Sequence, residues 1–109
     1  MFFKKKKKPQ PEPEKLVRLT AEEARAKSLA ENQREYNETL DLITSKFYTK
    51  IEEASARGWY TVEIYLDQFS RKTYIPDLVK DLTAEFESKG YTIKYMEETY
   101  GFWVIWKTK

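Results

Sequence analysis

Acidic side chains are the residues of this chain whose type and spacing come nearest to a catalytic arrangement. They form adjacent pairs or lie one helical turn apart: Glu22-Glu23, Glu52-Glu53, Glu97-Glu98, and Asp77 with Asp81. Two carboxylates that converge in one cleft can act as a general acid and base or bind Mg²⁺. Here they fall at a helix start, on helix surfaces and in a turn, where solvation explains them better. We therefore expect no catalytic residues and predict that the protein is not an enzyme.

The residue types that many other mechanisms require are missing. The 109-residue chain contains no cysteine and no histidine. Their absence excludes disulfides, Ser–His and Cys–His nucleophiles, and the commonest zinc ligands. Its three glycines form no phosphate-binding loop. We expect no cofactor and no metal site.

A run of five lysines near the N-terminus is the second chemically distinctive feature. Such a run on a flexible arm can bind polyanions, and nucleic acid above all, in a salt-sensitive and sequence-independent way. An anionic membrane surface or an acidic protein would suit it as well, and a solubility tail that binds nothing is an equally good explanation. The candidate polyanion-binding residues are Lys4, Lys5, Lys6, Lys7 and Lys8.

The basic character belongs to the N-terminal segment alone. Residues 1–15 hold six lysines and two glutamates, whereas residues 16–109 hold 14 basic and 16 acidic side chains. Alternating prolines follow the lysines and favour extended conformations. We predict a disordered tail over residues 1–18 and a single domain over residues 19–109. The chain lacks an apolar run of transmembrane length, and Met1-Phe2-Phe3 does not resemble a secretory signal.

A long helix is expected to begin at Thr20 and to run toward Gly58. Thr20 and Glu23 form a capping box, and glycine is a natural helix stop. The second half carries a clear apolar stripe: Tyr36, Leu40, Ile43, Phe47, Ile51 and Ala54. An unbroken helix would be about 57 Å long, against a radius of gyration of about 13 Å for a domain of this size. Either it breaks near Asn32, or its first half overhangs and serves self-association, which we favour.

The rest of the chain alternates between strand and helix patterns. We expect strands at residues 59–67, 91–96 and 102–107, a turn at residues 97–101, and a second helix with Pro76 near its start and Gly90 at its end. The apolar stripe of this second helix consists of Ile75, Leu78, Val79, Leu82 and Phe86. The predicted fold is α+β, with a three-stranded mixed sheet in the order 2-3-1 and both helices on one face. The first two strands would run parallel through a right-handed crossover, with the third antiparallel between them.

The last strand is apolar on both of its faces, which makes it the most informative segment. If both helices cover one sheet face, a second set of large side chains faces away from them: Trp59, Tyr65, Met96, Trp103 and Ile105. Such residues are typical of the centres of protein interfaces. The alternative is that the long helix of the same chain folds over this face and closes a three-layer domain.

The pattern resembles a group of small tailed-bacteriophage proteins with the element order helix–strand–helix–strand–strand. The resemblance rests on the segments 19–25 (LTAEEAR), 51–54 (IEEA), 89–93 (KGYTI) and 104–106 (VIW), together with Gly58. The group carries a polar residue where this chain has Ile105. It implies the fold but no activity, so no functional residue is transferred.

These observations favour a non-enzymatic phage interaction or assembly protein, as a virion or host-binding component. We expect it to act through the aromatic sheet face and the long helix, as a homo-oligomer or with another phage or host protein. The alternative is a nucleic-acid-associated accessory protein tethered by the lysine run. The expected location is the host cytoplasm or the virion.

Overall fold

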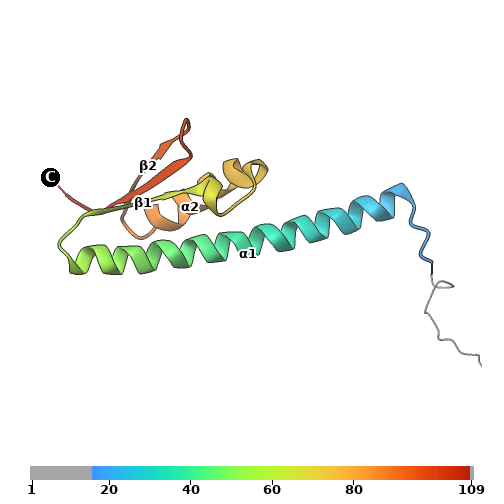
Figure 1. Cartoon of the computed structure of the whole chain (residues 1–109), viewed down its shortest axis with the longest axis horizontal. Helices are drawn as coiled ribbons and strands as arrows, with labels where there is room; N and C mark the ends of the chain where they lie inside the picture. Colours follow the sequence, from blue (N-terminus) through green and yellow to red (C-terminus); the bar gives the residue numbers. More distant parts are fainter. Residues whose placement is uncertain (1–15, 109) are drawn as a thin grey trace, which may run out of the picture. The chain divides into compact units, whose positions relative to one another are not determined.

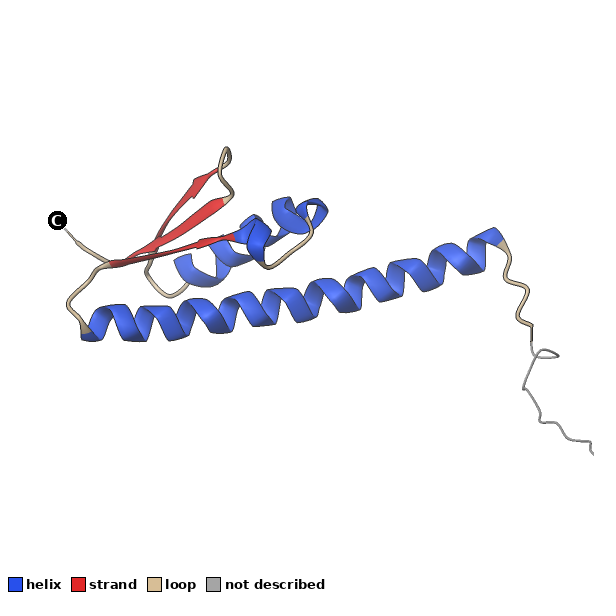
Figure 2. Cartoon of the chain, viewed as in Figure 1, coloured by secondary structure: helices blue, strands red, loops and turns tan. Residues whose placement is uncertain are grey.

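The computed structural model describes residues 16–108. It contains two α-helices, two short 3₁₀ helices and three strands (Figures 1 and 2). Their order is α1 (Ala21–Ala56), β1 (Thr61–Tyr65), η3 (Leu66–Gln68), η4 (Lys72–Tyr74), α2 (Ile75–Glu87), β2 (Thr92–Met96) and β3 (Gly101–Ile105). The chain divides into two units, Met1–Asn32 and Gln33–Lys109, which are considered separately. The α+β class is as predicted.

In the first unit, residues 16–20 have no regular secondary structure and α1 begins at Ala21. The predicted capping box is confirmed. The backbone N–H of Glu23 donates to the Thr20 hydroxyl at 3.1 Å, and the Thr20 N–H donates to the Glu23 carboxylate at 3.0 Å. Side chains over residues 21–32 are exposed, apart from half-buried Ala24. The lysine run, Lys4 to Lys8, lies outside the described residues.

Helix α1 continues through Asn32 to Ala56, so the break that we considered there does not occur. It ends where expected, because Gly58 adopts the left-handed conformation with φ +84°. Gly90 does the same after α2, with φ +93°.

The core of the second unit joins both helices to the strands. Phe47 of α1 packs edge-on against Phe86 of α2 at 5.3 Å and against Phe102 of β3 at 5.5 Å between ring centroids. The apolar stripes predicted for the two helices are confirmed as core residues. The fully or nearly fully buried side chains of this cluster are Tyr36, Ile43, Phe47, Ile51, Ile64, Leu66, Ile75, Leu78, Leu82, Phe86, Phe102 and Val104.

The sheet has the order β1-β3-β2, which is the predicted order read from the other edge. It is antiparallel rather than mixed. β3 lies in the middle and pairs antiparallel with both β1 and β2. β1 and β2 are not hydrogen-bonded to each other, so this sheet contains no parallel pair of strands.

The strands are shorter than predicted. β1 covers Thr61–Tyr65 rather than residues 59–67, because the chain turns into η3 at Leu66.

The turn before β3 places Tyr100 at φ 61°, a conformation that is uncommon for residues other than glycine. The Tyr100 carbonyl there accepts a 2.9 Å hydrogen bond from the Leu66 N–H, which ties this turn to the end of β1.

Candidate functional site

The strand register divides the sheet residues into two faces. One face carries core residues, among them Ile64, Phe102 and Val104. The alternate residues form the other face, here called the outer face. They lie in three rows across β1, β3 and β2: Thr61–Ile105–Thr92, Glu63–Trp103–Lys94 and Tyr65–Gly101–Met96.

The outer face exposes large apolar side chains. Tyr65 is 39% and Met96 is 38% exposed, while Trp103 and Ile105 are half-buried. These are four of the five predicted interface residues, and the register places them together. Their gathering on one face is a geometric finding, and their use as an interface remains a prediction.

A shallow groove of about 450 Å³ runs along the outer face and reaches all three of its rows. Its lining residues are Tyr60, Thr61, Lys94, Met96, Trp103, Ile105 and Lys107. Lys107 holds its ammonium nitrogen 5.1 Å from the centroid of the Tyr60 ring, within cation–π range. The groove therefore combines aromatic and aliphatic surface with two ammonium groups.

Glu63 is the carboxylate of the outer face, and it lies over Gly101. A Cβ atom added to Gly101 would be 2.9 Å from Glu63 Oε2 and 3.4 Å from the ring of Tyr65. The Glu63 carboxylate raises the pKa of Tyr65, first as a hydrogen-bond acceptor for the protonated hydroxyl and then through its negative charge. Because Gly101 has no side chain, it leaves the space that the Glu63 carboxylate occupies.

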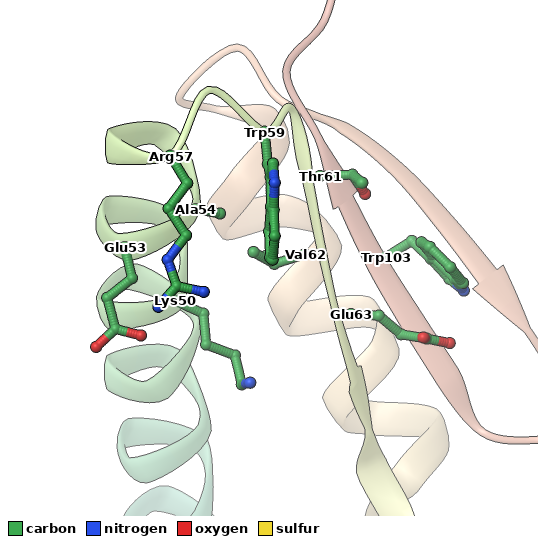
Figure 3. A pocket seen from close by; sticks show the side chains of 9 residues that line it. All are labelled: Lys50, Glu53, Ala54, Arg57, Trp59, Thr61, Val62, Glu63 and Trp103. Atoms are coloured by element: carbon green, nitrogen blue, oxygen red, sulfur yellow. The ribbon is translucent and has the colours of Figure 1, made fainter.

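Trp59 and Tyr60 lie outside the strand that was predicted to contain them. We expected a strand over residues 59–67 with Trp59 on the same face as Trp103, but both residues precede β1. Figure 3 shows Trp59 between the last turns of α1 and β1, with Trp103 across β1 from it. Tyr60 is 50% exposed and lines the outer groove. The Tyr60 carbonyl accepts a 2.9 Å hydrogen bond from the Trp106 N–H, so backbone contact with the end of β3 continues to this residue.

Trp59 lines a second pocket of about 390 Å³, which is drawn in Figure 3. Its lining residues are Lys50, Glu53, Ala54, Arg57, Trp59, Thr61, Val62, Glu63 and Trp103. The Arg57 guanidinium carbon lies 5.4 Å from the Trp59 ring centroid. Cations and carboxylates both line this pocket, so it shows no clear preference for a ligand of either charge.

Two carboxylates of α2 have structural partners. The Tyr36 hydroxyl donates to Asp81 at 2.5 Å, and the Tyr48 hydroxyl donates to Glu85 at 2.6 Å. Hydrogen bonds from Tyr48 and Lys89 lower the pKa of Glu85. These bonds tie α1 to α2, and the sequence analysis missed them. The signal was present, since tyrosines border the apolar stripe of α1 and acidic residues recur every fourth position on α2.

Residues 16–108 contain no group of three or more acidic, histidine or cysteine side chains placed to hold a metal ion. None of the helices in this part of the chain is long and apolar enough to cross a membrane. No family model, curated protein or solved structure matches this chain.

Proposed function

We propose that the protein is a non-enzymatic binding protein that works by association through the outer face. The supporting observation is the position of Trp103 at the centre of the outer face, in the middle row and on the middle strand. Tyr65 and Met96 lie in the next row, and each is more than one third exposed. Large aromatic and thioether side chains at the centre of a patch are typical of interface hot spots.

The arrangement of the helices is part of this proposal. We infer that α2 and the part of α1 within the second unit both cover the sheet face that bears Phe102 and Val104. The contact of Phe47 with both Phe102 and Phe86 supports this, since this ring of α1 packs on β3 and on α2. The outer face would then require a partner to bury its apolar surface.

The partner is a second copy of the chain or a subunit of a larger assembly. A virion or host-binding role in a bacteriophage is the form of assembly that the sequence resemblance favours. Trp59, at 55% exposure, would extend the contact beyond the sheet.

A nucleic-acid accessory protein is the second candidate, and one structural observation favours it. Lys94 and Lys107 line the same groove as Trp103 and Tyr60. Single-stranded nucleic acids bind to surfaces that combine aromatic stacking with basic groups. The lysine run would add sequence-independent attachment to phosphates.

Substitution of Trp103 by serine tests the first candidate. We expect Trp103→Ser to abolish both self-association in sedimentation velocity and retention of other proteins by the immobilised chain. Leu42→Ser is the matched control, because Leu42 is 48% exposed on α1 and its loss should leave association unchanged. Equal behaviour of the two variants would contradict the proposal.

Deletion of residues 1–8 tests the second candidate. The nucleic-acid proposal expects this deletion to remove most of the affinity for an oligonucleotide at low salt, and the association proposal expects assembly to persist. A full-length chain that binds no oligonucleotide at low salt would eliminate the second candidate.

A further inference from the structure

The central row of the outer face has opposite charges on its two sides. Glu63 lies on β1, Trp103 on β3 and Lys94 on β2, and the register pairs both flanking residues with Trp103. The row therefore reads negative, aromatic, positive across the sheet. Such a row is complementary to a copy of itself turned end for end.

We infer that the partner of the outer face is a second copy of this chain, packed sheet against sheet about a two-fold axis that lies within about 15° of the direction of β3. This inference rests on the proposed function and specifies its partner. The two-fold operation places β1 of one copy over β2 of the other and leaves β3 over β3. Glu63 then faces Lys94 of the second copy, and this contact occurs twice, as isologous interfaces require.

The same operation makes the remaining rows compatible. Tyr65 comes to face Met96 of the second copy, a sulfur–aromatic pairing that is favourable in protein contacts. Trp103 and Ile105 lie along the axis and meet their own copies. A two-fold axis perpendicular to the strands would instead place Glu63 against Glu63 and Lys94 against Lys94. The charges therefore select one of the two face-to-face arrangements.

Stacked sheets pack about 10 Å apart with their strands rotated by about 30°. Under this rotation the two outer rows shift more than the central row with Trp103, because they lie farther from the centre of the face. In the single chain the Glu63 carboxylate and the Tyr65 ring both lie over Gly101. The ammonium group of Lys94 from the second copy would become an additional partner of this carboxylate.

The size of the face sets the expected affinity. Three paired strands of five residues span about 17 by 14 Å. This area is below that of a standard stable interface, even with Trp59 and Tyr60 at its margin. We therefore expect a dimer with a dissociation constant of about 10–100 μM, which sets the concentrations that the experiment requires.

Charge reversal tests the arrangement by sedimentation of the full-length chain at up to about 500 μM, above the expected dissociation constant. We expect Glu63→Lys alone and Lys94→Glu alone to weaken homodimerisation by about tenfold or more, since each places like charges opposite each other. Mixing these two variants should restore dimers, as heterodimers, and the double reversal should restore homodimers. The control variants are Lys80→Glu and Glu87→Lys, which reverse exposed charges on α2 and should change little. Circular dichroism establishes that each variant is folded.

Several results would overturn the inference. A wild-type dimer that both single reversals leave intact would show that the copies meet elsewhere. A wild-type monomer over the whole concentration range that retains another protein through Trp103 would remove the second copy as partner, while the proposed function would stand. A monomer that binds a single-stranded oligonucleotide through Lys94 and Lys107 would support nucleic acid instead. A monomer without any Trp103-dependent partner would overturn both the inference and the proposed function.

Discussion

Tyr36 is the residue at which burial and hydrogen bonding act together most strongly. It is 9% exposed, and its hydroxyl donates to Asp81 on α2. Burial raises the pKa of Tyr36 well above its usual value near 10, and the hydrogen bond and negative charge of Asp81 raise it further. The protonated, neutral hydroxyl is thus the form that the folded chain requires.

This pKa shift makes stability depend on alkaline pH. Because the folded pKa of Tyr36 exceeds the unfolded pKa, the stabilisation is fully present below about pH 10 and is lost as the pH rises further. We expect Tyr36→Phe to lower the free energy of unfolding by about 1–2 kcal/mol at pH 7. The variant should also lose less stability than wild type between about pH 10 and pH 12. Urea unfolding at several pH values measures both effects, and identical pH dependence in the two proteins would contradict the assignment.

Gly58 and Gly101 are suited to glycine for different physical reasons. Gly58 has φ +84° and open space where a Cβ atom would lie, so only its backbone conformation demands glycine. We expect Gly58→Ala to cost about 1 kcal/mol of stability. Gly101 has an ordinary φ, but a Cβ atom there would meet Glu63 Oε2 at the end of a flexible side chain. Gly101→Ala should cost less than about 1 kcal/mol, since this side chain can move. Urea unfolding of both variants provides the comparison, and an equal or greater loss in Gly101→Ala would contradict the distinction.

At the level of elements, Phe47 is the contact point of α1, α2 and β3. It is fully buried and its ring meets Phe86 and Phe102 edge-on. We expect Phe47→Ala to lower the free energy of unfolding by about 3–5 kcal/mol, because it leaves a cavity where three elements meet. Leu42→Ala, at a 48% exposed position, should cost less than about 1 kcal/mol. Phe47→Leu gives a milder variant for chemical denaturation, and a small loss in Phe47→Ala would contradict this role.

The start of α1 depends on a local device rather than on packing. Thr20 and Glu23 satisfy each other's backbone N–H groups, and the residues that follow are largely exposed. We expect Thr20→Ala to destabilise the first turn by about 1 kcal/mol, which corresponds to about fivefold faster amide exchange there. Global unfolding should stay unchanged. Slower or unchanged exchange over residues 21–24 would show that the capping box contributes nothing.

For the whole molecule, the charges of the N-terminal segment and the outer face have separable effects. Residues 1–15 carry six lysines and two glutamates, so the segments of two associated chains repel each other unless a polyanion binds them. We expect a chain without residues 1–15 to self-associate as strongly as the full chain or more strongly, with the largest difference at low salt. Sedimentation in about 0.05 M and 0.5 M salt measures this. Weaker association after the deletion would mean that the segment contributes directly to assembly.

The sequence alone determined the features that depend on local chemistry. Thr20, Glu23 and Gly58 set the limits of α1, because caps and left-handed stops act over a few residues. The apolar stripes identified the core faces of both helices. Two-residue alternation placed Tyr65, Met96, Trp103 and Ile105 on one face, because successive side chains of a strand point to opposite sides.

Only the tertiary structure decided what depends on contacts between distant segments. The antiparallel register brought Glu63 and Lys94 to the two sides of Trp103, and spacing along the chain cannot specify such a row. The turn after α1 left Trp59 and Tyr60 outside the strand that was predicted to contain them. The bonds from Tyr36 to Asp81 and from Tyr48 to Glu85 exist because two helices pack together. Local sequence fixes which side of an element is apolar, whereas long-range packing fixes which residues meet across elements.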